Sequence, residues 1–176
     1  MTKKTWSKDN PGFIKGRVFE IDLTTKLNQF EGCTLYSNFW IYSHRLRNKT
    51  EIDKLLVTPW GIYCIEAKSF DTALEGSFSD KFWVGWTGRK PTTIINPVFQ
   101  NLEHCRALNA LIRRKGQKPI TLRNYVVVPD TCVIKTNCGN VVSVSRLLEI
   151  LVSNSLNKRY IKVNEMTLFI KSLQSS

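Results

Sequence analysis

The sequence predicts an α/β fold in which a mixed β-sheet is flanked by helices. Three observations support this prediction. Two Asn-Pro pairs, at residues 10–11 and 96–97, each precede an apolar pattern with helical spacing. Several β-rich segments lie between these pairs, and a continuous apolar run at residues 125–128 follows the second pair. Helices that alternate with strands in this order are typical of a sheet covered by helices.

The first helix is predicted to begin at Pro11 and to end near residue 30. Asn10 is a preferred N-cap residue, and proline suits the first helical position because its missing N–H would be unsatisfied there in any case. Apolar residues at helical spacing predict the buried face; they are Ile14, Val18 and Ile21. Gly16 lies inside this helix, where glycine costs about 1 kcal/mol relative to alanine, so we expect another group to approach the backbone there.

Strands are predicted for most of the segment between the two long helices. Residues 34–43 are rich in aromatic and β-branched side chains, which favour a strand. A basic turn at residues 44–49 then leads into a hairpin over residues 50–68, whose own turn contains Pro-Trp-Gly at residues 59–61. Residues 75–95 hold glycines among aromatic side chains, and we expect one or two further short strands there.

The second long helix is predicted to start at Pro97, with Asn96 as its N-cap, and to stop at Gly116 after a basic last turn. Residues 125–128 form a continuous apolar run, as expected of a central strand buried on both faces. Three short elements follow: a strand at residues 141–144, a helix capped by Ser145 that ends near residue 154, and a helix at about residues 164–173.

The charge of the chain favours a polyanionic partner. Lys and Arg number 26 against 14 acidic residues, a formal charge of +12 over 176 residues, and each phosphate that a protein neutralises releases counterions. A membrane surface is the other anionic partner, but no segment resembles a basic amphipathic anchor. No apolar run approaches the roughly 20 residues of a membrane span. The start of the chain lacks an apolar signal core, so we expect a cytoplasmic protein.

Cysteine and histidine content argues against two further classes of site. The five cysteines include no C-x-x-C pair, and none has partners at zinc-site spacing, so we expect reduced and mostly buried thiols. The sequence has two histidines, His44 and His104, which lie far apart. A nuclease that depends on several histidine ligands is therefore poorly supported.

Three charged residues border the apolar runs of the hairpin and form the candidate catalytic group. Asp53 directly precedes the run at residues 55–57, and Glu66 and Lys68 directly follow the run at residues 62–65. Charges beside buried strands are usually paired or functional. Hydrolysis of a phosphodiester needs a hard divalent cation on carboxylate oxygens and a group that positions water, which are the roles these side chains suit. The alternative is a solvated strand end.

The geometry of the hairpin leaves the position of Asp53 open. Glu66 and Lys68 are two residues apart, so their side chains project from the same face of the strand. An even-length loop around residues 60–61 places Asp53 on that face, opposite Lys68 and diagonal to Glu66. A three-residue loop turns Asp53 to the other face, unless a bulge or bend near it restores the alignment.

The chain resembles the nuclease-related domain family, a branch of the PD-(D/E)XK nuclease superfamily. The matching segments are G-R-V-F-E at residues 16–20, T-E-I-D at 50–53, G-I-Y-C-I-E-A-K at 61–68 and N-P-V-F-Q-N-L-E-H at 96–104. The resemblance implies a restriction-endonuclease-like αβββαβ core over about residues 12–130. The length suits one domain, so we expect a single nuclease-like domain over residues 1–176, in which residues 131–176 form an α/β extension outside the resemblance.

The resemblance also implies roles for individual residues. Asp53 and Glu66 would bind Mg²⁺ or Mn²⁺, with the Ala67 carbonyl as a third ligand, and Lys68 would be the catalytic lysine. Glu20 would approach the metal or its water. Gln100 resembles the glutamine of a Q-x-x-x-Y motif, although His104 stands at the tyrosine position and is expected to be structural.

The predicted function is therefore metal-dependent hydrolysis of DNA, with RNA as the alternative substrate. Candidate contacts to the phosphate backbone are the cations Arg45, Arg47, Arg89 and Lys90. Each of these cations also has the simpler interpretation of a solvated charge. The alternative function is a catalytically silent module that keeps the nuclease fold and binds nucleic acid or another protein.

Overall fold

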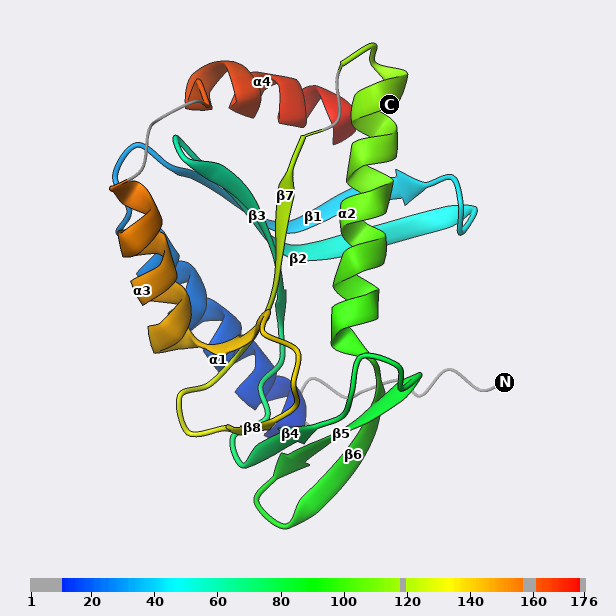
Figure 1. Cartoon of the computed structure of the whole chain (residues 1–176), viewed down its shortest axis with the longest axis vertical. Coiled ribbons are helices and arrows are strands. Elements are labelled where there is room, and N and C mark those ends of the chain that lie inside the picture. Colours follow the sequence, from blue (N-terminus) through cyan, green and yellow to red (C-terminus); the bar gives the residue numbers. More distant parts are fainter. Residues whose placement is uncertain (1–10, 118–119, 157–160, 175–176) are drawn as a thin grey trace.

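A computed structural model describes residues 11–117, 120–156 and 161–174 (Figure 1). The predicted cap Asn10 lies outside these residues. The helices are α1 (Pro11–Leu27), α2 (Pro97–Arg114), α3 (Val144–Ser155) and α4 (Val163–Gln174). The strands are β1 (Thr34–Ser43), β2 (Asn48–Thr58), β3 (Gly61–Ala67), β4 (Ala73–Glu75), β5 (Phe82–Thr87), β6 (Lys90–Ile95), β7 (Leu122–Val128), β8 (Val133–Lys135) and β9 (Val141–Ser143).

The strands form two mixed sheets, which confirms the predicted α/β class. The larger sheet has the order β1-β2-β3-β7-β9, antiparallel from β1 to β3 and parallel from β3 to β9. The smaller sheet, β6-β5-β4-β8, was not predicted. It forms because the segment at 73–95 supplies three strands, and because Gly85 lets the ring of Phe70 pack against its backbone, where an added Cβ would lie 2.4 Å from that ring.

Helices cover both faces of the larger sheet (Figure 1). Helices α1 and α3 pack on one face against Leu56, Tyr63 and Ile65, whereas α2 and α4 pack on the other against Leu55 and Cys64. Strand β7 lies between β3 and β9, and residues 126–128 are fully buried. The prediction of a central strand buried on both faces is therefore confirmed. Within the described residues, no helix has both the length and the apolar character needed to cross a bilayer.

The predicted buried face of α1 is wrong. Ile14, Val18 and Ile21 are 51%, 60% and 61% exposed, and a second apolar row is buried in their place, namely Phe19, Leu23 and Leu27. Both rows repeat at helical spacing, so periodicity alone does not choose between them. The expected close approach at Gly16 is also absent, because an added Cβ would meet nothing nearer than Ser69 Oγ at 3.6 Å.

The predicted boundaries of α2 are confirmed by its caps. The Asn96 side chain accepts hydrogen bonds from the backbone N–H groups of Val98 and Phe99. Gly116 follows the helix with φ of 76°, a conformation that glycine adopts without strain. Helix α3 is capped by Ser143 rather than by the predicted Ser145. All five cysteines are described and free, and three of them are buried, as expected.

Candidate active site

The hairpin of β2 and β3 brings Asp53 and Glu66 together. Its loop has two residues, since Thr58 pairs with Gly61, and the Thr58 hydroxyl donates to the Gly61 carbonyl at 2.7 Å. The last pair in the ladder is Lys54 with Ile65, so Asp53 lies opposite Glu66 at the next position. The even-length alternative is therefore confirmed. The register differs from the expected one by two residues, because Asp53 lies opposite Glu66 and diagonal to Lys68, and not the reverse.

The ladder between β1 and β2 is interrupted at Asp53. The register between β1 and β2 is continuous except for the position where Asn38 faces Asp53, and Asn38 has a positive φ of 53°. Ile52 and Leu55 are three residues apart yet belong to the same hydrophobic core, so the side-chain alternation shifts between them. Asp53 therefore lies where the alternation of β2 shifts, between two residues that both belong to the core.

Direct contacts connect the candidate residues across three segments. Asp53 Oδ2 accepts a hydrogen bond from the Ala67 N–H at 2.8 Å. The Lys68 ammonium donates to Glu66 Oε1 at 2.7 Å and lies 3.4 Å from Gln100 Oε1 on α2. The structure thus brings Asp53, Glu66, Ala67, Lys68 and Gln100 into one cluster at the end of β3.

The acid pair is electrostatically crowded. Burial, followed by repulsion from Glu66, raises the pKa of Asp53 to about 7, although the Ala67 N–H and the Lys68 ammonium oppose the shift. Burial also acts to raise the pKa of Glu66, but the side chains of His104 and Lys68 outweigh it and hold that pKa below the ordinary value. Near neutral pH the cluster therefore holds one ionised acid beside one that is partly protonated, and a cation that binds both carboxylates must displace that proton.

The oxygens of this cluster suit a hard divalent cation. Glu66 Oε2 is buried and has no hydrogen-bond partner among the described residues, and Asp53 Oδ1 likewise accepts no hydrogen bond from them. No group of three or more His, Cys, Asp or Glu side chains within the described ranges is arranged around a metal position. Mg²⁺ is commonly held by one or two carboxylates together with substrate phosphates, so this donor pair fits it.

Two buried polar residues near the cluster were not predicted as part of it. His104 Nε2 lies 3.5 Å from Glu66 Oε2, longer than a hydrogen bond, and its Nδ1 is 2.8 Å from the Thr50 hydroxyl. Lys54 is only 2% exposed, and its ammonium lies 3.7 Å from Glu20 Oε2 on α1. The sequence offered one indication that Lys54 belongs near the site: it directly follows Asp53 and places a charge beside an apolar strand segment.

Glu20 lies at the border of the cluster. Its side chain is 38% exposed, and its charge contributes to the raised pKa of Asp53.

The four predicted phosphate contacts lie elsewhere. Arg45 donates to Glu103 at 2.7 Å near the turn between β1 and β2, which also carries Arg47. Arg89 and Lys90 lie at the turn between β5 and β6, at a different corner of the molecule (Figure 1).

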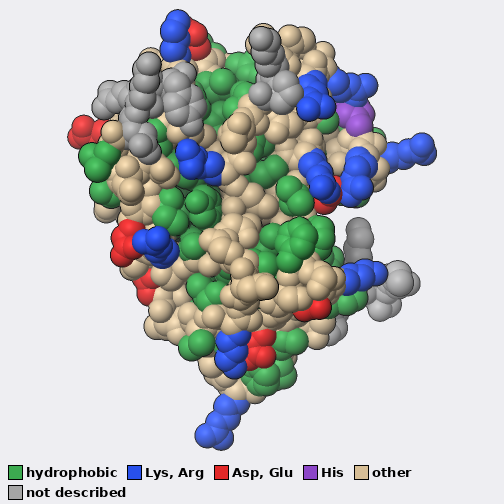
Figure 2. All heavy atoms as spheres, in the orientation of Figure 1, with side chains coloured by type: hydrophobic (Ala, Val, Ile, Leu, Met, Phe, Trp, Pro, Cys, Tyr) green, Lys and Arg blue, Asp and Glu red, His purple; other side chains and the backbone are tan. Residues whose placement is uncertain are grey.

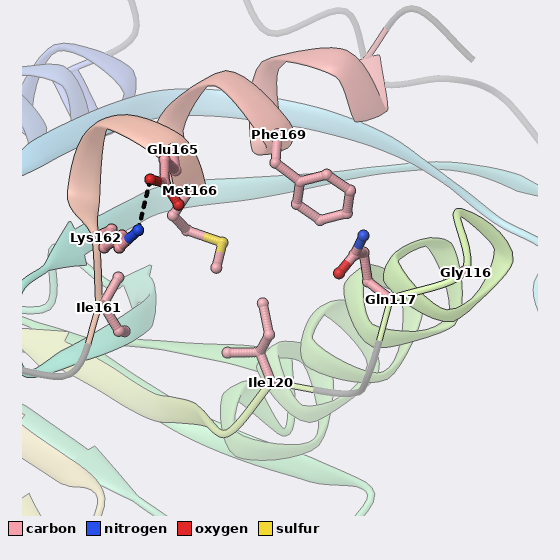
Figure 3. A pocket seen from close by; sticks show the side chains of 8 residues that line it. All are labelled: Gly116, Gln117, Ile120, Ile161, Lys162, Glu165, Met166 and Phe169. Atoms are coloured by element: carbon pink, nitrogen blue, oxygen red, sulfur yellow. Dashed lines mark hydrogen bonds and ion pairs between the residues drawn. The ribbon is translucent and has the colours of Figure 1, made fainter.

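The surface views add two observations. Figure 2 shows Lys and Arg side chains gathered around a histidine over the end of α2, where Arg114 contacts His44. A pocket of about 760 Å³ lies between α4 and the segment after α2. Figure 3 shows the side chains that line it. Its lining is mainly apolar, with one ion pair between Lys162 and Glu165, and it contains none of the candidate residues. This pocket is therefore separate from the acid pair.

Comparison with known proteins identifies the family of the chain. Residues 15–129 match the family described as the nuclease-related domain, and this range contains Asp53, Glu66 and Lys68. An uncharacterised protein of Bacillus anthracis is 25% identical over 103 residues, which cover 57% of this chain and 48% of that protein. The chain thus spans about half the length of this relative. No solved structure matches the chain significantly. On the family match, the chain belongs to the nuclease-related domain family.

Proposed function

We propose that this protein is a divalent-metal-dependent nuclease that hydrolyses phosphodiester bonds of DNA. The observation that carries the proposal is the acid pair Asp53–Glu66, with the Lys68 ammonium 2.7 Å from Glu66 Oε1. The order α1-β1-β2-β3-α2-β7 supports a restriction-endonuclease-like αβββαβ core, into which β4 to β6 are inserted before α2. Family membership and the charge of +12 support a nucleic-acid substrate.

The proposed roles follow from the contacts of each side chain. Asp53, Glu66 and the Ala67 carbonyl would hold Mg²⁺ or Mn²⁺, which supplies positive charge to the phosphate under attack. Lys68 positions the attacking water and stabilises negative charge as it develops. Glu20, partly exposed at the border of the cluster, accepts the proton of that water. Gln100 orients the Lys68 ammonium from α2.

Cleavage of plasmid and linear DNA with Mg²⁺ or Mn²⁺ tests the proposal. Lys68→Ala and Asp53→Ala are each expected to lower the rate by at least about 10²-fold, because each removes a group that acts on developing charge. Lys162→Ala is the matched control, since Lys162 pairs with the exposed Glu165 on α4 and contacts no candidate residue among those that the structure describes. Thermal unfolding shows whether each variant is folded. Folded Lys68→Ala protein that cuts DNA as fast as the wild type would refute the proposal.

One observation favours the silent binding module as the second candidate. The ammonium of Lys68 is engaged by Glu66, and the pKa of Asp53 near 7 weakens metal binding at neutral pH, because a proton competes for the site. Salt-dependent binding of DNA or RNA, without cleavage under any divalent cation, would support this candidate over the nuclease.

A further inference from the structure

Lys54 is a buried cation with an incomplete set of partners. Its side chain lies on the face of β2 that packs against α1, because its cross-strand neighbour Ile65 belongs to the core formed with Phe19 and Leu23. Within the described residues its one partner is Glu20, whose Oε2 is 3.7 Å from the ammonium. This distance makes an ion pair but is too long for a hydrogen bond.

An ammonium group has three donors, and a buried charge is costly unless it is both paired and hydrogen-bonded. Glu20 compensates Lys54 only in part, since its own carboxylate is 38% exposed and shared with water. The donors of Lys54 are therefore available for an additional oxygen ligand that approaches from the side of α1.

A cleft of about 330 Å³ opens at this point between α1 and the strands β1 and β2. Its lining residues are Arg17, Glu20, Ile21, Thr24, Thr25, Ser37, Asn38 and Lys54. Among the described lining residues, Arg17 and Lys54 are cations and Glu20 is an acid. The Thr24 and Thr25 hydroxyls donate to carbonyls of their own helix, whereas the exposed Ser37 hydroxyl makes no hydrogen bond within the described part of the chain.

We propose that this cleft is a phosphate-binding subsite for the backbone of a nucleic-acid strand. Lys54, Arg17 and the Ser37 hydroxyl would donate to the phosphate oxygens, as expected for backbone contacts that carry no sequence information. Glu20 is a wall of the cleft, and its charge also acts on Asp53, so the cleft lies within electrostatic range of the acid pair. The inference rests on the proposed nuclease function, because it assigns the substrate backbone a second contact beside the site of hydrolysis.

Binding of a fluorescein-labelled DNA single strand of about 12 nucleotides, measured by anisotropy in EDTA, tests the subsite. The Lys68→Ala protein serves as the background, so that no strand is cut. Adding Lys54→Met, which keeps the length of the side chain but removes its charge, is expected to raise Kd roughly five- to tenfold. The slope of log K against log salt is expected to fall by about 0.7, the value for one phosphate contact on a single strand.

Lys26→Met is the matched control, because Lys26 pairs with Asp22 on α1 and does not line the cleft. Equal Kd values for the Lys54→Met and Lys26→Met proteins would overturn the subsite. If Lys54→Met loses turnover in the Lys68 wild-type protein while binding is unchanged, Lys54 only positions Glu20, which also overturns it. If Lys54→Met does not fold, Ser37→Asp replaces it, with Ser172→Asp on α4 as its control.

The outcomes separate this inference from the proposed nuclease. A wild-type protein that binds the strand through Lys54 but never cuts it would refute the nuclease and leave the subsite standing. A protein that cuts DNA, but whose binding is indifferent to Lys54→Met and to Ser37→Asp, would leave the nuclease standing and refute the subsite.

Discussion

Under the proposed function, Asp53 carries a conflict between stability and function at the level of a single side chain. Because its pKa is raised to about 7, Asp53 is mainly protonated below that pH in the folded, metal-free protein. Metal binding requires the carboxylate instead. A group whose folded pKa lies above its unfolded value contributes stability below the unfolded value, near 3.9, and loses it as the pH rises through the folded value. The metal-free protein therefore loses stability at this residue between about pH 4 and pH 7.

Asp53→Asn is expected to stabilise the metal-free protein at pH 8, by about 2 kcal/mol, while abolishing cleavage. Asparagine imitates the protonated acid and can still accept the hydrogen bond from the Ala67 N–H. Urea unfolding in EDTA at pH 5 and pH 8 measures the effect, and the gain should shrink at the lower pH. Asp22→Asn, at an exposed acid on α1, controls for the loss of a negative charge. A gain that is the same at both pH values would contradict the argument.

The sequence allowed the core of the site to be predicted, because alternation along one strand places Glu66 and Lys68 on the same face. The position of Asp53 depends on the number of residues in the hairpin loop. The sequence Pro-Trp-Gly is compatible with a two-residue or a three-residue loop, so it did not settle that number. His104 and Lys54 could not be assigned to the site, since their partners, Glu66 and Glu20, come from other segments of the chain. Such contacts depend on how helices dock against the sheet, which no local pattern specifies.

At the scale of elements, α2 was predictable because three independent local signals coincide in it: a cap, an apolar stripe and a glycine stop. Helix α1 shows the opposite case. It carries two apolar rows, and docking on the larger sheet selects Leu23 and its neighbours over Ile14, Val18 and Ile21. The smaller sheet was missed for a related reason, since β8 lies far along the chain from β4, with which it pairs.

Asn96 connects α2 to the smaller sheet, and its loss is expected to cost more than the loss of an ordinary cap. The side chain is 1% exposed; its oxygen caps α2, and its amide donates to the carbonyls of Ser77, Phe78 and Asp80. Asn96→Ala is expected to destabilise the protein by about 3 kcal/mol, measured by urea unfolding.

Ser143→Ala is the comparison, because Ser143 accepts one backbone hydrogen bond at the start of α3 and its other partner is the side chain of Asp130. Its loss should cost about 1 kcal/mol. Asn96→Asp keeps the capping oxygens but loses the amide donors, so an intermediate cost is expected. If Asn96→Ala and Ser143→Ala cost the same, the contacts of Asn96 with the loop at residues 77–80 contribute nothing to stability.

At the scale of the whole molecule, the cations behind the charge of +12 differ in how far neighbouring acids compensate them. Some cations are already compensated, as Arg45 and Arg106 are by Glu103, whose pKa these two side chains hold below its ordinary value against the opposing effect of burial. Others, such as Arg47 at the turn between β1 and β2, have no ion pair within the described residues. The sequence predicts a polyanionic partner from the total charge, but only the fold indicates which cations remain available to it.

This difference gives a prediction for DNA binding across the molecule. Arg47→Ala is expected to weaken binding of a DNA duplex about three- to tenfold at low salt and to reduce the salt slope by about 0.9, the value for one phosphate contact. Arg45→Ala should have a smaller effect, because the Arg45 guanidinium already donates to Glu103 at 2.7 Å and its removal frees that acid to pair with Arg106 alone. Anisotropy titrations at several salt concentrations measure both variants. Equal losses would show that ion pairs within the chain do not decide which cations contact the backbone, and that total charge alone governs association.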